Sequence, residues 1–345
     1  MKKKKNLLIL THHFWPEYFL INDITKELHK YYNIKVVTTH PNYPLGKIFH
    51  GYENKKVFIE KFYKDIEVLR IPTFQRNKSN FLNIFFDYIS FNLSFLIYSF
   101  TILKFIKKTD FIFFFGTSPL TSAIPGIFLK KIYSSKLILW LQDLWPEAII
   151  STGYIKSKFI IKIINRIMSF IYNQSDLILC QSNFFVRTIK KRTKIKNIKY
   201  FSKIINSKKN RIINIPISLE DTLKKNFCIV YTGNIGKVQN LELLIKVSKK
   251  FISYPKIKFV IIGQGSNLEL IKKLKNMLSA KNVILIPQLE NNQMQSIYSL
   301  SNALYLSFNG DYWMNNCIIP GKLQPYLKSG KPILASIGGE TARLI

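Results

Sequence analysis

The sequence predicts two successive α/β domains, each built on a doubly wound parallel sheet, which face each other across a cleft. Three observations lead to this fold class. The chain has 345 residues, which is more than one average domain needs. Short apolar runs alternate along it with longer helical stretches, which is the rhythm of βαβ units. A polar, charged segment at 219–226 interrupts this rhythm, which then resumes.

The first domain is expected over residues 1–216. Most of its strand candidates are continuous apolar runs, as expected for parallel strands that helices cover on both faces. A Rossmann-like sheet results, with its carboxyl edge at the cleft. Strands are predicted at 6–11, 34–39, 66–71, 111–115, 136–141, 177–181 and 211–215, and helices at 20–31, 81–107, 119–132, 157–173 and 182–193.

The second domain is expected over residues 217–345 and is also Rossmann-like. Its last helix has barely begun at Ile345, so the domain is expected to be incomplete at its C-terminal end. In two facing sheets, ligands bind where the carboxyl ends of the strands meet. Strands are predicted at 227–232, 257–262, 282–286, 303–307 and 332–335, and helices at 239–252, 266–279, 291–300 and 320–328.

The composition narrows the class of partner. A formal net charge of +33 is compatible with binding to nucleic acid. However, the excess of Lys comes with an excess of Ile, Asn, Phe and Tyr, which is typical of A/T-rich coding sequence, so no nucleic-acid partner is expected. An anionic lipid surface is the better match, since each Lys or Arg near it contributes about 1 kcal/mol. The 47% apolar content excludes global disorder.

The cysteines and the N-terminus favour a cytoplasmic protein. The run Leu7–Leu10 follows several lysines and imitates a signal peptide, but His12 and Pro16 end it too early, so we expect a first buried strand. Three widely spaced cysteines form neither a zinc pattern nor a disulfide framework, and we expect reduced thiols at Cys180, Cys228 and Cys317.

Segment 81–107 is almost wholly apolar, with Asp87 and Asn92 as its main interruptions. Its length permits a membrane span, but a span here would thread the middle of the sheet through a bilayer. A buried core helix explains one apolar stripe. A helix in the membrane interface, with aromatic side chains inserted and lysines at the edge, explains apolar residues nearly all round. We expect the interfacial helix, and the buried helix stays open.

Two glycine loops follow strands of the second domain and precede helices: Tyr231–Lys237 and Val260–Ser266. Glycine lets a backbone approach a ligand, and a helix start offers free N–H groups to phosphate. Two such loops at neighbouring strand ends favour a nucleotide, although glycine is also common here for packing. The patterns of NAD sites and P-loops are absent. The candidate binding residues are Gly233, Asn234, Gly236, Lys237, Gly263 and Gly265.

Three further residues are candidates for chemistry. Lys322 would begin a helix, where a cation is unfavourable to the helix dipole, and a bound diphosphate would explain it. A solvated lysine is the alternative. Glu17 and Asp143 follow strands at the edge that faces the cleft, where acidic residues are better placed to contact a substrate than to stabilise the fold. Metal-binding His/Glu spacing is absent, so no protein-bound metal and no cofactor are expected.

Taken together, these segments resemble glycosyltransferase family 4, retaining enzymes with the GT-B fold, and within it the N-acetyl-L-fucosaminyl transferases of O-antigen and capsule synthesis. The resemblance implies a hexosyltransferase that moves a sugar, such as an N-acetylated deoxyhexosamine, from a UDP-sugar in the second domain. It implies a polyprenyl-diphosphate-linked saccharide as acceptor in the first domain, at the anionic inner leaflet of a bacterial plasma membrane. The matching segments are 14–17, 22–23, 41–46, 140–147, 231–239, 263–266 and 320–332.

This chain departs from the family at several positions. Asn234 and Gln239 stand where many members carry Arg and Lys, and Gln142 stands where they carry His. Cys317 and Pro325 stand near the positions of two glutamates. Stabilisation of the leaving group is therefore expected from Lys322, Lys237 and helix N-termini. The family also runs on for tens of residues beyond Arg343, so we expect a less stable closed form.

Three alternatives to an active transferase stay open. One is an inactive, truncated glycosyltransferase-like protein that still binds UDP. Another is a basic nucleic-acid-binding protein, which would show steeply salt-dependent binding. The last is a GT-B sugar-nucleotide epimerase, which needs neither a lipid acceptor nor an apolar helix at 81–107.

Overall fold

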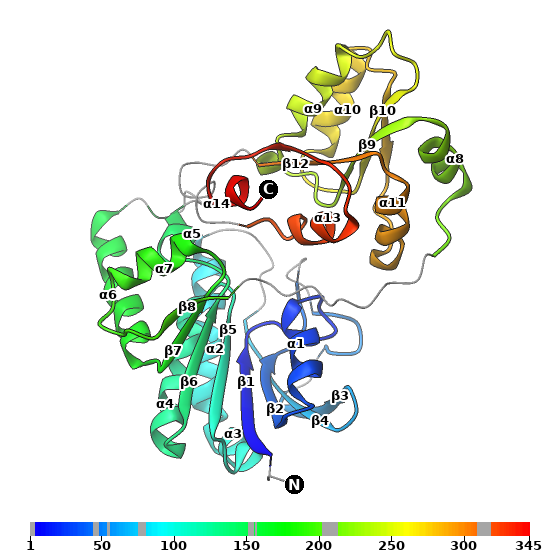
Figure 1. The fold of residues 1–345 in the computed structure, drawn as a ribbon. Helices are drawn as coiled ribbons and strands as arrows, with labels where there is room; N and C mark the ends of the chain where they lie inside the picture. Colours follow the sequence, from blue (N-terminus) through cyan, green and yellow to red (C-terminus); the bar gives the residue numbers. More distant parts are fainter. Residues whose placement is uncertain are drawn as a thin grey trace. The chain divides into compact units, whose positions relative to one another are not determined.

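The computed structural model describes residues 4–43, 48–53, 56–74, 81–150, 155, 157–201, 213–308 and 319–345. The chain divides into two compact units, residues 1–203 and 204–345, each built on one sheet (Figure 1). The predicted boundary after residue 216 lies later than this division. Ile213 and Ile215 already pack in the second unit, because Ile213 N donates to Ser296 Oγ at 2.9 Å and Ile215 lies in a buried cluster.

The first unit has an eight-stranded sheet with the order β3-β4-β2-β1-β5-β6-β7-β8. Neighbouring strands are parallel except β3 and β4, which pair antiparallel at one edge. Burial explains the continuous apolar runs, since the residues from Leu7 to Leu10 are each at most 5% exposed. The strands are Lys5–Thr11 (β1), Tyr32–Thr39 (β2), Phe58–Phe62 (β3), Ile66–Ile71 (β4), Phe111–Gly116 (β5), Lys136–Leu141 (β6), Leu177–Cys180 (β7) and Ile198–Tyr200 (β8).

The strand predicted at 211–215 is wrong over residues 213–215, the part of it that the structure describes. Residues 213–216 have no regular structure, and the edge position that this strand would have taken belongs to β8. Strands β3 and β8 were not predicted. Both are edge strands with exposed positions, so their sequences lack the continuous apolar run that marks the buried strands.

Helices cover both faces of this sheet. Helix α1 packs with Leu7 and Ile9 in one core cluster, whereas Gly126 on α4 lies against Leu10 and Leu137. Because successive side chains of a strand point to opposite faces, these two helices lie on opposite sides. The helices are Leu20–Leu28 (α1), Phe81–Ile97 (α2), Ser99–Ile106 (α3), Leu120–Ala123 (η1), Ile124–Tyr133 (α4), Glu147–Ile150 (α5), Lys158–Gln174 (α6) and Asn183–Lys190 (α7).

Segment 81–107 forms two helices rather than one, α2 and α3, which meet at Tyr98. Phe91 is fully buried, whereas Leu96 and Phe100 are 70% and 80% exposed. The core contact of the alternative, a buried helix, therefore holds for one side of the segment, and the other side is apolar and exposed. No single described helix has the length and apolar content of a membrane span. The pair Ile89–Ile97 and Ser99–Ile106 has both when taken together, with a bend of 75°.

The second unit has a five-stranded parallel sheet with the order β11-β10-β9-β12-β13. Its strands begin and end within one residue of the predicted positions. The polar segment 219–226, predicted to interrupt the pattern, lies mostly in helix α8. The strands are Phe227–Thr232 (β9), Ile257–Ile262 (β10), Val283–Ile286 (β11), Ala303–Ser307 (β12) and Ile333–Ser336 (β13).

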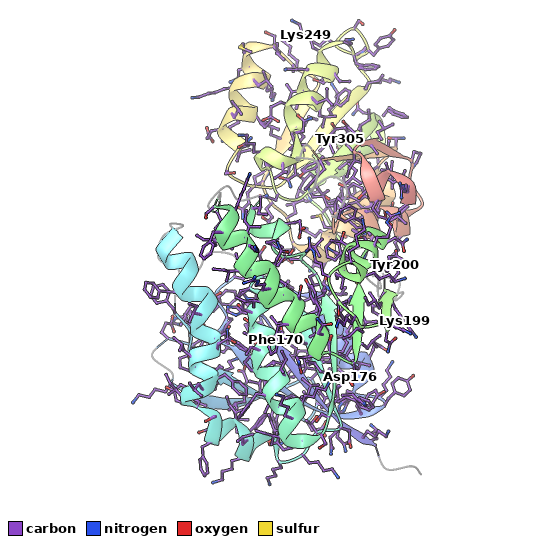
Figure 2. All side chains as sticks on the ribbon, turned by 90° about the vertical axis from the view of Figure 1, so that its left-hand side faces the viewer. Phe170, Asp176, Lys199, Tyr200, Lys249 and Tyr305 are labelled. Carbon is purple, nitrogen blue, oxygen red and sulfur yellow. The ribbon has the colours of Figure 1, made fainter. Side chains whose placement is uncertain are left out.

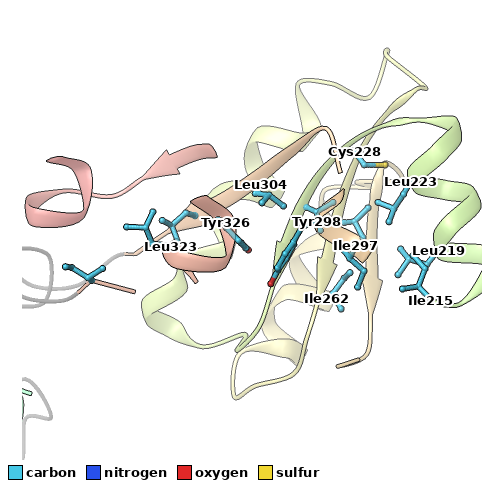
Figure 3. Close-up of a cluster of buried hydrophobic side chains, with 14 residues drawn as sticks. Ile215, Leu219, Leu223, Cys228, Ile262, Ile297, Tyr298, Leu304, Leu323 and Tyr326 are labelled. Atoms are coloured by element: carbon cyan, nitrogen blue, oxygen red, sulfur yellow. The ribbon is translucent and has the colours of Figure 1, made fainter. Parts of the chain in front are cut away.

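Two apolar cores lie on the two faces of this sheet. One contains Val230 and Tyr326 and is drawn in Figure 3, and the other contains Tyr231 and Leu244. Alternate residues of β9 thus enter different cores. The helices are Ile217–Lys225 (α8), Lys237–Gln239 (η2), Leu241–Lys249 (α9), Leu268–Met277 (α10), Asn291–Gln293 (η3), Met294–Leu300 (α11), Leu323–Ser329 (α13) and Gly339–Leu344 (α14).

Candidate functional site

The chain reverses direction across the second sheet between β9 and β12. From β9 it moves outward through β10 to β11, and it then returns to β12 on the other side of β9. At such a reversal, the loops at the carboxyl ends of the strands leave room for a ligand. The first glycine loop follows β9, and Lys322 precedes α13, the helix that follows β12. The topology therefore places both sequence candidates at one position of the sheet edge.

The two glycine loops pack against each other. Gly233 N donates to Ile262 O at 2.8 Å, and Ile235 N donates to Gln264 O at 2.8 Å. A Cβ atom on Gly263 would lie 1.9 Å from Gly233 O, which no side chain could tolerate. Gly263 is thus explained by contact between the loops. The approach of a ligand, which the sequence suggested for it, is not needed to explain it.

Most amides of the first loop are already engaged. Besides Gly233 and Ile235, Gly236 N donates to Gln239 Oε1 at 3.1 Å. This corrects the expectation that the loop offers these N–H groups to phosphate. In the second loop, the amides of Gly265 and Ser266 have no acceptor within the described part of the chain. These two remain available to an anion.

Lys322 lies against the first loop. Its Nζ atom is 3.8 Å from the centroid of the Tyr231 ring and donates to Tyr231 Oη. Its Cε atom is 2.6 Å from the position that a Cβ on Gly233 would occupy, so a side chain there would displace Lys322, and the φ of +117° favours glycine. Burial lowers the pKa of Lys322 to about 7. The alternative of a solvated lysine is excluded by these contacts.

A pocket of about 210 Å³ opens beside Lys322 and Gly233. Its walls are mainly apolar, and its polar groups are the Lys322 ammonium, the Gln288 amide and two hydroxyls. Binding pockets for small molecules typically combine apolar walls with a few placed polar groups. The remaining lining residues are Thr232, Ile262, Leu289, Met294, Tyr298, Gly321 and Pro325.

A network of hydroxyl groups holds the carboxyl end of β9 beneath this pocket. Thr232 N donates to Tyr326 Oη at 3.1 Å, and Thr232 Oγ1 lies 2.9 Å from Tyr298 Oη. The two tyrosine rings lie 5.4 Å apart, one on α11 and one on α13 (Figure 3). The strand end is therefore tied to both helices that frame the pocket. The sequence did not mark Tyr231, Tyr298 or Tyr326 as site residues, because a Tyr beside Ile, Val or Leu is typical of a core residue.

Of the predicted binding residues, Gly233 and Lys322 line the pocket, whereas Asn234, Gly236, Lys237, Gly263 and Gly265 do not. Lys237 is exposed at the start of η2, and Asn234 is exposed with its amide directed to Gln239 Oε1 at 3.5 Å. Neither lines the pocket. The position of Lys237 therefore does not support its predicted role in stabilising a leaving group. Among the described residues, Lys322 is the cation that lines this pocket.

Glu17 has a different task from the predicted one. It is 2% exposed, and its carboxylate accepts from Asn42 N at 2.9 Å and from Tyr43 N at 2.7 Å. It also accepts from Phe14 N at 3.1 Å and lies 3.2 Å from His13 Nδ1. Burial raises the pKa of Glu17, but His13 and the two loop amides lower it further, so the pKa lies below its ordinary value. Glu17 joins the loop after β1 to the loop after β2, and its saturated oxygens argue against direct contact with a substrate.

Asp143 keeps one oxygen available. Its Oδ2 atom accepts from Ser118 N at 3.0 Å and from Ser118 Oγ at 2.8 Å. Trp145 Nε1 in turn donates to Ser118 Oγ at 3.0 Å. No donor among the described residues lies on Oδ1. Asp143 is therefore held in place through one oxygen and is able to accept from a hydroxyl through the other.

Glu147, which ends the segment Trp145-Pro146-Glu147, pairs with Arg192, and Arg192 also donates to Trp145 O at 2.9 Å.

Cys180 and Cys228 are free and buried, and burial raises their pKa values to about 12 and about 11. Cys317 lies outside the described residues. Over the described ranges, no three metal-ligating His, Cys, Asp or Glu side chains gather.

A comparison with known families matches part of the second unit, which carries the pocket. Residues 218–309 match the family model described as "Glycosyl transferases group 1". The match includes both glycine loops and the strands β9 to β12. This stretch of the second unit is therefore similar to group 1 glycosyltransferases. Lys322 lies beyond the matched residues.

The curated relatives of this chain are distant in sequence. An uncharacterized glycosyltransferase of Methanocaldococcus jannaschii is 24% identical over 208 residues, 56% of this chain and 49% of that protein. The glycosyltransferase WbjE of Pseudomonas aeruginosa is 23% identical over 243 residues, 67% of this chain and 58% of that protein. WcaI of Escherichia coli K12, named as a colanic acid biosynthesis glycosyl transferase, is 21% identical over 346 residues, 94% of this chain and 81% of that protein. The matches thus span only 49% and 58% of the first two relatives.

Solved structures share the fold over the whole chain. Anabaena HepE in complex with UDP has a TM-score of 0.66 at 12% identity, covering 99% of this chain and 83% of that chain. Sucrose-phosphate synthase from Thermosynechococcus elongatus also has a TM-score of 0.66 at 12% identity, covering 99% and 84%. The chain has the GT-B fold. The predicted fold class is confirmed, whereas membership of family 4 and of its N-acetyl-L-fucosaminyl branch stays a prediction.

Proposed function

We propose that this protein is a retaining glycosyltransferase that moves a sugar from a UDP-sugar to a saccharide linked to polyprenyl diphosphate. The observation that carries the proposal is the position of Lys322. Its ammonium lies on Tyr231 at the reversal of the second sheet, beside a pocket with mainly apolar walls. A nucleoside diphosphate matches this arrangement, because its flat base suits the apolar walls and its diphosphate suits the Lys322 ammonium. HepE and its UDP complexes, which share the fold, support this donor class.

Transfer of the sugar depends on stabilisation of the leaving diphosphate and does not require a nucleophile on the protein. As the bond between the sugar carbon and the diphosphate oxygen breaks, negative charge grows on the diphosphate. A protonated Lys322 beside the pocket stabilises that charge, and the amides of Gly265 and Ser266 add two donors at the neighbouring loop. An oxygen of the departing diphosphate accepts the proton of the acceptor hydroxyl, which then forms the new bond on the same face. Lys322 supplies the positive charge, so we propose no protein-bound metal.

The acceptor is assigned to the first unit. Asp143 Oδ1 at the carboxyl end of β6 is the open carboxylate oxygen there, and we propose that it accepts from an acceptor hydroxyl. The name of the relative WcaI supports a role in surface polysaccharide synthesis, such as lipopolysaccharide or capsule. We propose an N-acetylated deoxyhexosamine as the sugar, in keeping with the sequence resemblance. The protein then works in the cytoplasm at the inner face of a bacterial plasma membrane.

The proposal is tested in two steps on the full chain. A thermal shift screen compares UDP, UMP and several UDP-sugars, and we expect stabilisation by UDP and its sugars but little by UMP. Transfer to a polyprenyl-diphosphate-linked saccharide is then followed by mass spectrometry, and the anomeric configuration by NMR. Stabilisation by UDP without transfer would identify an inactive relative. Conversion of the UDP-sugar without an acceptor would identify an epimerase, and DNA binding without an effect of UDP would reject the proposal.

A further inference from the structure

Helix α4 exposes an apolar stripe on its outward side. Ile124, Phe128 and Ile132 recur every four residues and are 39%, 52% and 46% exposed. Ile127 and Leu129 on the inward side are buried. A helix that covers a sheet normally presents polar residues to water on its outer face. The outer side of α4 therefore carries the kind of residue that is usually buried.

Helix α6 shows the same feature. Phe159, Ile163 and Phe170 are 72%, 40% and 51% exposed, while Met168 and Tyr172 on its inner side are fully buried. Apolar surface on one helix is common in soluble proteins, but a second helix with the same outward stripe enlarges it. Figure 2 shows Phe170 on the outside of this helix.

The exposed stripes belong to one continuous layer. Helix α4 contacts both α2 and α6, and the three helices lie next to one another in front of the sheet (Figure 2). Lys130 Nζ donates to Gln174 O at 2.7 Å and lies 2.7 Å from Asp176 Oδ2, so α4 is fixed to the end of α6. Tyr133 Oη donates to Leu103 O at 3.3 Å, which fixes α4 to α3. The apolar face is defined by Leu93, Leu96, Ile97, Phe100, Ile124, Phe128, Ile132, Phe159, Ile160, Ile163 and Phe170, each at least 39% exposed.

Cations accompany this apolar face, and acids are nearly absent from its helices. Asp87 is the one acidic residue in α2, α3, α4 and α6. Five exposed cations lie on the same helices, and none has an ion-pair partner in the described part of the chain: Lys104, Lys131, Lys158, Lys162 and Arg166. An apolar surface with unpaired cations at its side complements a bilayer with anionic headgroups.

We propose that the apolar face, spread over α2, α3, α4 and α6, docks on an anionic bilayer with its aromatic side chains inserted and its cations at the headgroups. A second copy of the chain is a poorer occupant. A two-fold contact would bring the same face of each copy together and set the unpaired cations of both copies against each other. A bilayer satisfies both features at once. The inference does not depend on the transfer reaction, and it extends the surface beyond segment 81–107.

The test is sedimentation with vesicles, using the full chain. The vesicles are pure phosphatidylcholine, or three parts phosphatidylcholine to one part phosphatidylglycerol. The variant Phe128→Ser/Phe159→Ser changes one residue on each of α4 and α6. Because both side chains are exposed, we expect this variant to fold like the wild type. Its matched control is Leu270→Ser/Met277→Ser on α10, where the two residues are 50% and 74% exposed against 52% and 72%.

We expect the double variant on α4 and α6 to lower the partition coefficient on mixed vesicles at least ~10-fold, because two inserted aromatic rings are lost. The control should bind like the wild type. Lys131→Gln/Lys162→Gln should reduce binding roughly 5-fold per cation on mixed vesicles and leave binding to pure phosphatidylcholine unchanged.

Two outcomes overturn the inference. One is a Phe128→Ser/Phe159→Ser protein that sediments with mixed vesicles as well as the wild type does. The other is a wild-type dimer in light scattering that this variant converts to monomer, since a second copy would then cover the face. Thermal stabilisation by UDP is measured on every variant. It reports the nucleotide site in the second unit, so a failure of membrane docking is distinguished from a failure of the proposed function.

Discussion

The ammonium of Lys322 lies 3.8 Å from the centre of the Tyr231 ring and donates to the Tyr231 hydroxyl, which itself donates to Asn234 O. One tyrosine thus contacts both the cation and the glycine loop. The face of the ring and the hydroxyl offset part of the cost of removing the ammonium from water. Burial still lowers the pKa of Lys322 to about 7, so the free protein holds this lysine between its charged and neutral forms near neutral pH.

Lys322→Ala should lower kcat by about two to three orders of magnitude, the range found when one preorganised donor to a developing charge is removed. Turnover with a UDP-sugar and a lipid-linked acceptor measures it. Lys237→Ala is the control, because this lysine is exposed and does not line the pocket. It should keep nearly full turnover. Full activity in the Lys322 variant would remove Lys322 from the mechanism.

The affinity for UDP should fall as the pH rises above about 7, by at most ~10-fold per pH unit. The sign follows from the lowered pKa: above about 7 the free protein carries a neutral Lys322, and a diphosphate favours the protonated form, so binding takes up a proton. Burial raises the pKa values of Tyr231, Tyr298 and Tyr326, the titratable groups packed around it in the described residues, so these stay neutral in this range. Calorimetry in two buffers of different ionisation enthalpy measures the proton uptake. Equal apparent enthalpies at pH 8 would contradict it.

Tyr231→Phe keeps the ring beside Lys322 but removes the hydroxyl that donates to Asn234 O and accepts from Lys322 Nζ. Because that hydroxyl orders the glycine loop, we expect the KM for the UDP-sugar to rise ~5- to 10-fold, the effect of losing one such hydrogen bond. Turnover at saturating donor should change less, since Lys322 stays over the ring. Steady-state kinetics separate the two effects. Tyr231→Leu, which also removes the ring, should lower kcat as well, and equal kinetics of the two variants would show that the ring has no role.

The sequence was most informative where burial is complete. Strands β9 and β10 of the second unit are continuous, mostly buried apolar runs, and their limits follow from that alone. Edge strand β8 and the bend at Tyr98 depend on tertiary packing and have no local signal. Lys322 was identified because a cation is unfavourable at a helix start. Its partner Tyr231 was missed because nothing local distinguishes a strand-end tyrosine that binds a cation from a core residue.

The task of Glu17 could not be inferred from its position after β1. Two of its donors, the amides of Asn42 and Tyr43, come from a loop 25 and 26 residues further along the chain. Only the fold brings that loop to the carboxylate. The motif around Glu17 thus has a sequence signature, but its function as a clamp between two loops is visible only in three dimensions.

Glu17→Gln tests this clamp. A glutamine amide placed among the N–H groups of Phe14, Asn42 and Tyr43 would set a donor against donors, and we expect the free energy of unfolding to fall by about 2–4 kcal/mol. The folded pKa of Glu17 lies below its ordinary value of 4.5, so its contribution is present above that value and is lost as the pH falls through the folded pKa. The variant should therefore lose part of the acid dependence of wild-type stability. Urea unfolding at pH 7 and at pH 3 measures both effects, with Glu27→Gln on the exposed side of α1 as control. Unchanged stability combined with lost turnover would instead place Glu17 in contact with the substrate.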